Sequence, residues 1–303
     1  MKACEYSGKG PVTLGGQMKH FLIYANEYKD KNLVTAKRIR DFLQLKGQRA
    51  TITVMGGREG NPAAGGKRAE EIPEDADCMI VLGGDGTVLE AVRAAKGLPV
   101  PIIGVNLGTL GYMTEIEPSG LEEALERLIA GDYVQESRMM LKGRISFPDG
   151  QVKEGWALND IVISRSGSLQ IIRFGIYVNG QFLNQYHADG MIVTTPTGST
   201  GYNLSAGGPL VEPGAELIML TPICPHSLNQ RSIILSSADV IEIEIPECRE
   251  GREQTVEVSF DGSHVTPLRT GDRIRIARSD KVTKFIRLNQ VSFLEVLHRK
   301  MQG

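Results

Sequence analysis

Residues 78–87 read Cys-Met-Ile-Val-Leu-Gly-Gly-Asp-Gly-Thr, an apolar run that ends abruptly in a glycine turn with one acid. The run from Cys78 to Leu82 has the length and side-chain branching of a buried parallel strand. Helical spacing of apolar residues resumes from Val88 to Ala95. A strand that passes into a helix N-terminus presents free backbone N–H groups, and the helix dipole favours an anion there. We therefore expect a phosphate-binding turn at Gly83, Gly84, Gly86 and Thr87.

Asp85 is the unexpected member of this turn, because a carboxylate is repelled by a polyphosphate. Its presence needs a reason, which is either a metal ion or a proton to remove. The alternative is a tight turn with an acid near a helix start, a common arrangement. Two better-known phosphate motifs are absent: Asn61–Arg68 lacks the residues of a Walker A loop, and Leu89 fills the third glycine position of the dinucleotide fingerprint. A dehydrogenase-type cofactor site is not supported.

The composition is that of an ordinary globular chain, with 303 residues, 41% hydrophobic, 23% charged and a net charge of −2. No basic block indicates nucleic acid binding, and no apolar run approaches the roughly 20 residues that span a bilayer. Residues 1–17 lack the apolar core of a signal peptide, and we expect a disordered extension or an upstream start there. The four cysteines are dispersed, which favours reduced thiols in a cytoplasmic protein. The histidines are dispersed too, and no zinc site is predicted.

From Met18 to about Pro118 the pattern alternates strand and helix. This βαβ order predicts a parallel sheet that binds ligands at the carboxyl ends of its strands. Gly83–Thr87 and Asn106–Tyr112 both follow such strands, which is the first indication of one site. A glycine-rich stretch, Gly56–Pro73, is predicted to be a mobile loop. The expected strands are His20–Ala25, Thr51–Val54, Cys78–Leu82 and Pro101–Val105, and the first helix is Thr35–Lys46 closed by Gly47.

The pattern becomes nearly all strand after one more helix. Ser119-Gly-Leu-Glu122 reads as a capping box for a helix that Gly131 ends. From about Tyr133 to Lys284 we expect a β-rich domain. Its signals are an Asn-Gly hairpin turn at 179–180, the alternating run 241–245, and a hairpin and its neighbour formed by 256–260, Asp261-Gly262 and 273–277. Gln290–Lys300 is predicted to return to the first domain.

Three polar segments interrupt the β-rich half. Residues 186–209 crowd hydroxyls at Thr195, Thr197, Ser199, Thr200 and Ser205 onto a loop in which Tyr202 can stack on a ring; the alternative is a turn that caps a helix from Tyr202 onward. Asn159-Asp160 are poor strand formers, and their alternative reading is a bulge or turn. Pro225-His226-Ser227 with Arg231 is the third segment, or else a simple connection.

These segments occur together in the order and spacing of the NAD kinases, which the chain resembles from about Met18 to its end. The Gly-Gly-Asp-Gly core alone is shared with phosphofructokinases and with diacylglycerol and sphingosine kinases. The resemblance is carried by the following set: Gly83-Gly-Asp-Gly-Thr87, Asn106-x-Gly-x-x-Gly-Tyr112, Asn159-Asp160, Asp189-Gly190, Thr195-Pro-Thr-Gly-Ser-Thr200 with Tyr202, and Pro225-His-Ser-Leu228 with Arg231.

The resemblance implies a Rossmann-like α/β domain with a parallel sheet (18–132 and about 285–303) that binds the phosphate donor. It implies a β-rich, sandwich-like domain (133–284) for NAD binding and oligomerisation, with the active site in the cleft between the two. The implied reaction is transfer of the γ-phosphate of Mg-ATP, or of polyphosphate, to the adenosine 2′-hydroxyl of NAD, for NADP biosynthesis in the cytoplasm. Family members are usually homodimers or homotetramers.

The same resemblance assigns residue roles. Asp85 is the implied catalytic base, with Mg²⁺ offsetting the charge of the phosphates, and no metal-ligating residue is assigned. Asn159 and Asp160 resemble the pair that holds the nucleotide. Asp189, Thr200, Tyr202 and Ser205 resemble the lining of the dinucleotide pocket, Tyr112 stands where phenylalanine is common, and His226 resembles a residue near the phosphates. Three positions depart from the family pattern: Gly201 replaces alanine, Ser232 replaces proline, and His187 lies where NAD and NADH are distinguished.

Two other functions were weighed. A lipid kinase of the same superfamily needs an apolar acceptor groove, whereas residues 186–205 are rich in hydroxyls. A nucleotide-binding sensor without chemistry would be signalled by loss of Asp85 or erosion of the second loop, and neither is seen.

Overall fold

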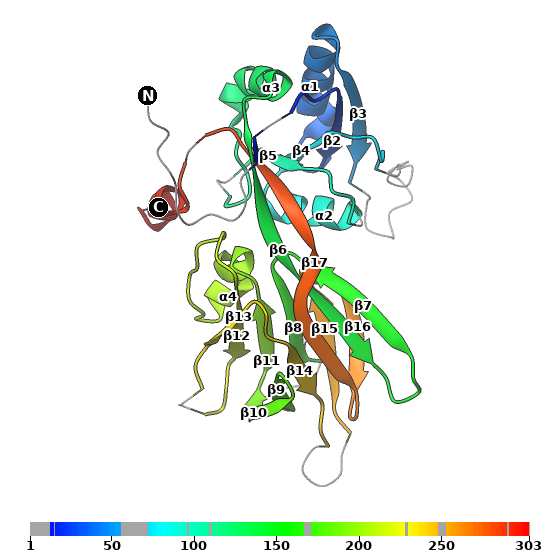
Figure 1. Ribbon diagram of the computed structural model, residues 1–303, viewed down its shortest axis with the longest axis vertical. Helices are drawn as coiled ribbons and strands as arrows, with labels where there is room; N and C mark the ends of the chain where they lie inside the picture. Colours follow the sequence, from blue (N-terminus) through cyan, green and yellow to red (C-terminus); the bar gives the residue numbers. More distant parts are fainter. Residues whose placement is uncertain are drawn as a thin grey trace. The chain divides into compact units, whose positions relative to one another are not determined.

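The computed structural model (Figure 1) describes residues 13–302 apart from 15, 56–71, 96, 109–110, 167–170, 228–229, 248–252 and 290. The chain divides into two compact units. Unit 1 comprises residues up to Ser137 together with Thr283 onward, and unit 2 is Arg138–Val282. The predicted mobile loop, Gly56–Pro73, lies almost wholly outside the described residues.

Unit 1 is built on a parallel sheet in the order β3-β2-β4-β5. Every residue of β2, β4 and β5 is buried, as expected of a parallel strand covered on both faces. Helices α1 and α3 cover one face and α2 the other (Figure 1). The bounds are His20–Ala25 (β2), Arg49–Val54 (β3), Cys78–Gly83 (β4), Ile102–Asn106 (β5), Val34–Leu45 (α1), Asp85–Ala94 (α2) and Leu121–Ala130 (α3).

The C-terminus returns to unit 1, as predicted. The end of β17 (Arg273–Arg287) pairs in parallel with β5 at Phe285 and Ile102, and α5 (Phe293–Gln302) follows. Arg287 then forms ion pairs with Glu115 at 2.8 Å and Glu136 at 3.1 Å. Burial lowers the pKa of Arg287 and the two carboxylates raise it, with a net rise. Buried charges of this kind require partners, so the return also completes an ion-pair network.

Unit 2 is antiparallel throughout its described pairings and encloses one core between two sheets. One sheet has the path β10-β9-β14-β17 with β6 and β7, and the other runs β13-β12-β11-β8-β15-β16. The bounds are Val134–Ser146 (β6), Val152–Ala157 (β7), Asp160–Arg165 (β8), Ile172–Val178 (β9), Gln181–Ala188 (β10), Gly190–Thr194 (β11), Leu217–Ile223 (β12), Ile233–Ser236 (β13), Ile241–Glu244 (β14), Thr255–Phe260 (β15) and Ser263–Arg269 (β16). The predicted combination of an α/β fold and a β-rich fold is therefore confirmed.

Both predicted hairpin turns form. Asn179 and Gly180 have φ of 52° and 77°, the left-handed pair that a two-residue turn requires, and Val178 pairs with Gln181 across it. Asp261 and Gly262 do the same between β15 and β16. The predicted neighbour of this hairpin was wrong, because residues 273–277 join β14 in the other sheet.

Short elements correct three further predictions. The capping box is wrong, because Pro118–Gly120 form a 3-10 turn (η2) and Gly120, not Ser119, is the N-cap of α3. Helix α2 begins at Asp85 rather than Val88. The expected disordered extension does not hold for its last residues, since Thr13–Leu14 (β1) pair with β6. The remaining short elements are η1 (Lys31–Leu33), η3 (Thr197–Thr200) and α4 (Tyr202–Ser205).

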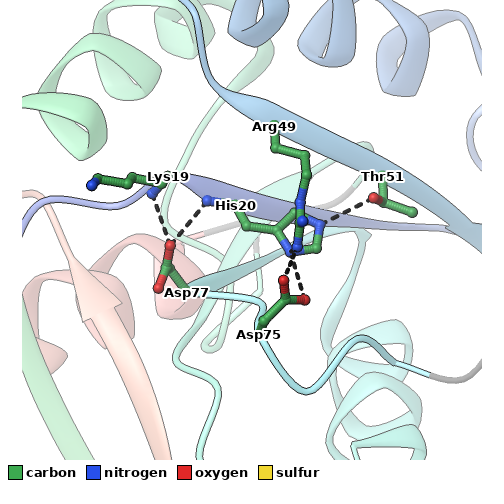
Figure 2. Close-up of polar contacts among 6 residues, drawn as sticks. All are labelled: Lys19, His20, Arg49, Thr51, Asp75 and Asp77. Carbon is green, nitrogen blue, oxygen red and sulfur yellow. Dashed lines mark hydrogen bonds and ion pairs between the residues drawn. The ribbon is translucent and has the colours of Figure 1, made fainter.

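A polar cluster, drawn in Figure 2, lies where β2 and β3 begin and just before β4. These are the opposite strand ends from the one that carries the glycine turn. Asp77 accepts the backbone N–H groups of Lys19 and His20 at 2.8 and 2.9 Å. The buried His20 ring contacts Thr51 and Asp75, each at 3.1 Å, and Asp75 also pairs with Arg49. The Arg49 hydrogen bond lowers the pKa of Asp75, with smaller contributions from charge and from His20. These contacts join the starts of β2 and β3 to the segment before β4, which is a structural role.

Candidate active site

Asp85 is held at the first position of α2 by two backbone N–H groups. The N–H of Tyr112 donates to Oδ2 at 2.9 Å, and the N–H of Met113 donates to Oδ1 at 3.0 Å. Gly84 is the N-cap of the helix and has no side-chain cap. The carboxylate is half-buried. Its orientation is therefore set by the loop after β5 rather than by its own helix.

The glycines around Asp85 fall into two groups, according to the space that a Cβ atom would have. A Cβ on Gly111 would lie 2.1 Å from Oδ1 of Asp85, and a Cβ on Gly83 would lie 2.3 Å from Oγ1 of Thr87. Gly84, Gly86 and Gly108 have open space where a Cβ would be. The first two glycines are required by the fold of the cluster. Gly84 and Gly86, at the start of α2, leave the backbone there accessible to an incoming group.

The two strand ends predicted to share a site are neighbours in the sheet. Gly83 pairs with Asn106, and Asn106 Oδ1 accepts the N–H of Gly108 at 3.0 Å. The buried Thr87 packs against Gly83. Burial first, and the nearby Asp85 second, raise the pKa of Tyr112. Unit 1 thus brings all of its predicted site residues into one cluster.

In unit 2, Asn159 and Asp160 lie where β7 passes into β8, on a backbone held by Asp261. The Asp261 carboxylate accepts the N–H groups of Leu158, Asn159 and Asp160 at 2.8, 2.7 and 3.1 Å. Sequence reasoning missed this role, because an Asp-Gly pair predicts only the turn, in which Asp261 adopts a φ of 47°. No local sequence pattern links this carboxylate to the backbone of residues 158–160.

Both predicted nucleotide-binding side chains are buried. Burial first, and the charge of Asp261 second, raise the pKa of Asp160 to about 7. Oδ1 of Asn159 has no hydrogen-bond donor among the described residues, although only 9% of the residue is exposed. A buried amide oxygen without a donor is costly, so each such group in a native protein calls for an explanation. A bound ligand that donates a hydrogen bond supplies one.

The hydroxyl-rich loop has an inner and an outer part. Thr195 Oγ1 donates to the carbonyl of Leu158 at 2.6 Å, and Ser199 Oγ donates to that of Val211 at 3.1 Å. Thr195 and Ser199 are fully buried, so the expectation that they offer hydroxyls to a ligand is wrong. Tyr202 is 47% exposed, Ser205 is exposed, and Thr200 is half-buried. These outer residues are the ones that a ligand can reach.

Arg138 is a further residue that sequence reasoning missed. It is 4% exposed, and its Nη1 lies 3.4 Å from Oγ1 of Thr197. The buried guanidinium thus contacts the inner part of the hydroxyl-rich loop. No local motif marks Arg138, which lies inside the long strand β6.

The remaining predicted residues form a second group in unit 2. Asp189 pairs with Arg165 at 3.6 Å, and the N–H of His226 donates to the carbonyl of His187 at 2.9 Å. Two of the positions that depart from the family pattern, Gly201 and Ser232, are compatible with their surroundings in the structure. A Cβ on Gly201 would meet only ordinary or slightly tight contacts, at 3.4 Å or more, and Ser232 contacts Thr221 through its hydroxyl at 2.9 Å.

Among the described residues, no group of three or more His, Cys, Asp or Glu side chains could hold a metal ion. Within the same residues, no helix is long and apolar enough to cross a membrane. One chain thus combines a parallel sheet that ends in a Gly-Gly-Asp-Gly turn with a β unit that carries a buried amide–acid pair.

Comparisons with known proteins place this combination in one family. Residues 21–133 match the ATP-NAD kinase N-terminal domain, and residues 158–288 match the ATP-NAD kinase C-terminal domain. The NAD kinase of Lachnospira eligens is 44% identical over 94% of this chain and 100% of its own. That of Agathobacter rectalis is 46% identical over 94% and 99%. The chain belongs to the NAD kinase family, the enzymes that phosphorylate NAD to NADP with ATP.

Two solved structures are similar over 94% of the chain. An NAD kinase from Archaeoglobus fulgidus in complex with ATP has a TM-score of 0.72 at 26% identity, over 100% of its chain. The yeast NADH kinase complexed with NADH has a TM-score of 0.83 at 24% identity, over 88% of its chain, and shows the shared fold.

Proposed function

We propose that this chain transfers the γ-phosphate of ATP to the adenosine 2′-hydroxyl of NAD, with Asp85 as the base. The observation that carries this proposal is the Asp85 carboxylate fixed by the N–H groups of Tyr112 and Met113 beside an open glycine turn. Phosphoryl transfer depends on positioning and on a group that accepts the proton of the attacking hydroxyl. A pinned carboxylate meets both needs.

Gly83, Gly84, Gly86 and Thr87 are the proposed phosphate-binding segment. The first N–H groups of an α-helix generally have no acceptor within the helix, and those of Asp85 and Gly86 hold these places in α2, whereas the N–H of Thr87 donates to the carbonyl of Gly84 at 2.9 Å. Because Gly84 and Gly86 have space around their Cα atoms, a phosphate can approach the backbone closely.

Magnesium is proposed to arrive with ATP. Mg²⁺ is usually held by one or two carboxylates, several waters and the substrate phosphates. Because Asp85 is proposed to accept the proton of the hydroxyl, we assign the ion no protein ligand and propose that the ATP phosphates and water hold it. When bound, the ion supplies charge that offsets the phosphates next to Asp85.

Unit 2 is proposed to recognise NAD. The Asn159 amide suits an adenine edge, the Asp160 carboxyl suits the ribose hydroxyls, and the exposed Tyr202 ring suits stacking. Asp189, Thr200, Gly201, Ser205, His187 and His226 are proposed to complete the binding surface, and Tyr112 the donor side. We propose a cytoplasmic location, for which the dispersed cysteines are the support.

The deciding experiment measures NADP formation from NAD and Mg-ATP with an NADP-specific dehydrogenase. Asp85→Asn is expected to lower kcat by about 10²- to 10⁴-fold, the contribution of a general base. Asp132→Asn, an exposed aspartate of the same unit, is the matched control. Wild-type activity in Asp85→Asn would reject the base, and parallel reactions with polyphosphate identify the donor.

Self-association is proposed to occur through unit 2. Strand β10 ends its sheet, five successive residues from Gln181 are exposed, and Phe182 is 59% exposed with Leu183 beside it. An apolar edge strand of this kind is a pairing surface. Light scattering should give a dimer or tetramer for the wild type and a smaller species for Phe182→Glu. Tyr28→Glu, at an exposed aromatic residue of unit 1, should leave the mass unchanged.

A further inference from the structure

The C-terminal helix α5 has few means of attachment to unit 1. None of its ten residues is buried, and Leu294 and Met301 are 71% and 77% exposed. A helix of this length is marginal in water without tertiary contacts. The contacts that it does make therefore determine whether and where it docks.

Two of those contacts meet on one aromatic ring, that of Tyr112. The Phe293 and Tyr112 ring centroids are 6.2 Å apart, with the rings tilted by 38°. The Lys300 ammonium lies 4.7 Å from the Tyr112 centroid, a cation–π distance. Phe293 and Lys300 are seven positions apart, two turns of one helix face, so that α5 holds the ring at two points.

The adjacent basic residue of α5 behaves differently. Arg299 forms an i,i+4 ion pair with Glu295 at 2.7 Å on the exposed side of the helix. Lys300 has no carboxylate partner among the described residues, and its charge is directed at the ring. In α5, therefore, Glu295 neutralises the charge of Arg299, whereas the charge of Lys300 interacts with the ring of Tyr112.

Tyr112 is also the residue whose backbone holds Asp85. Its N–H donates to Oδ2 of Asp85, and the next N–H in the chain donates to Oδ1. The backbone before it is close to the carboxylate as well, because no Cβ would fit on Gly111. Movement of the Tyr112 ring therefore moves the donors that orient Asp85.

We propose that Phe293 and Lys300 are positioning residues, which act through the Tyr112 ring to hold Asp85 in its reactive orientation. The inference rests on the proposed role of Asp85 as the base. It makes α5, which the sequence suggested only as a returning segment, part of the catalytic apparatus.

The test compares Lys300→Met, Lys300→Arg and Arg299→Met in steady-state kinetics. Loss of a cation–π contact is expected to lower kcat about two- to fivefold, with the KM values for ATP and NAD and the melting temperature nearly unchanged. Lys300→Arg should restore kcat, since guanidinium also binds an aromatic face, and Arg299→Met should match the wild type. Equal kcat in Lys300→Met and Arg299→Met would overturn the proposal.

A double-mutant cycle establishes the route. In a Tyr112→Leu background, Lys300→Met should cause no further loss, because the ring on which it acts is gone. The same fractional loss in both backgrounds would show that Lys300 does not act through Tyr112. If Asp85→Asn is fully active, the base assignment fails and this inference fails with it. An inactive Asp85→Asn with an unaffected Lys300→Met rejects this inference alone.

Discussion

At the scale of single residues, the geometry around Asp85 depends on two glycines that leave space for neighbouring side chains. Gly111 leaves room for the Asp85 carboxylate, and Gly83 leaves room for Thr87. In unit 2 the corresponding contributions come from acids, since Asp261 holds three backbone N–H groups and its charge acts on Asp160. Both clusters place a carboxyl group where its neighbours constrain it.

The two glycines of the loop after β5 should differ sharply when replaced by alanine. Gly111→Ala puts a Cβ 2.1 Å from Asp85, which must shift, and a displacement near 1 Å costs about 10²-fold in rate. Gly108→Ala meets nothing within 4 Å and should retain its activity. Steady-state kcat of the two variants checks this, and similar losses in both would contradict it.

The free energy of unfolding should fall as the pH rises from about 4 to 7, in part because of Asp160. Burial first, and the charge of Asp261 second, raise its folded pKa from the ordinary 3.8 to about 7, so unfolding releases a proton within this window. The stability conferred by the neutral form is present below pH 4 and is lost by about pH 7. Asp160→Asn should remove this contribution to the pH dependence, a change in the free energy of unfolding on the order of a few kcal/mol across the whole window.

Urea midpoints of the ligand-free protein at pH 5 and pH 8 measure that slope. Asp280→Asn, at an exposed position of unit 2, is the control and should keep it. A slope equally steep in Asp160→Asn and in the wild type would mean that another group titrates.

At the scale of elements, helix ends show how side chains replace missing backbone partners. Helix α1 has no side-chain cap at its N-cap, Leu33, which adopts φ of 55°. Asp30 supplies the cap from three residues earlier, accepting the N–H groups of Thr35 and Ala36 at 2.9 and 2.8 Å. Helix α2, in contrast, is left without a side-chain cap where a phosphate would bind.

Asp30→Ala should therefore destabilise unit 1 by about 1–2 kcal/mol, the upper part of the range for lost N-caps. Asp30 is buried, so the freed N–H groups of α1 gain little hydration. Asp41→Ala on the exposed side of the same helix should cost about 0.5 kcal/mol or less. Chemical denaturation midpoints compare the two, and equal shifts would show that Asp30 does not act as a cap.

At the scale of the whole molecule, unit 1 is not continuous in sequence. Its last part, from Thr283, arrives after the whole of unit 2 and brings the end of β17, Arg287 and α5. Arg287 donates hydrogen bonds to Glu115 and Glu136, both of which precede it by more than 150 positions. Completion of unit 1 thus depends on the C-terminus.

Arg287→Met should destabilise unit 1 by about 3–5 kcal/mol, because it removes the guanidinium from two largely buried ion pairs. Arg299→Met, which breaks an exposed pair on α5, should change stability by less than about 0.5 kcal/mol. Thermal unfolding followed by circular dichroism distinguishes them. A loss below about 1 kcal/mol in Arg287→Met would show that the carboxylates find other solvation.

The sequence alone determined the features that depend on neighbours in the chain. An unbroken apolar run predicts the buried strand at 78–82. The Asn179-Gly180 pair predicts a hairpin turn, because these residues readily adopt left-handed dihedrals. The junction of strand and helix locates Asp85. Combined motif spacing was sufficient to indicate the family, which the comparisons confirm.

Only the tertiary structure decided which polar groups meet across long separations. It directs the hydroxyls of Thr195 and Ser199 to buried carbonyl groups. It also brings the Asp261 carboxylate to the backbone N–H groups of Asn159 and Asp160, and Arg287 to Glu115. Such contacts leave no local pattern, because their energy comes from desolvation and hydrogen bonding in the folded chain. Local propensity places Asp85, the proposed base, at the start of a helix, and hydrogen bonds from the loop after β5 decide where its carboxylate points.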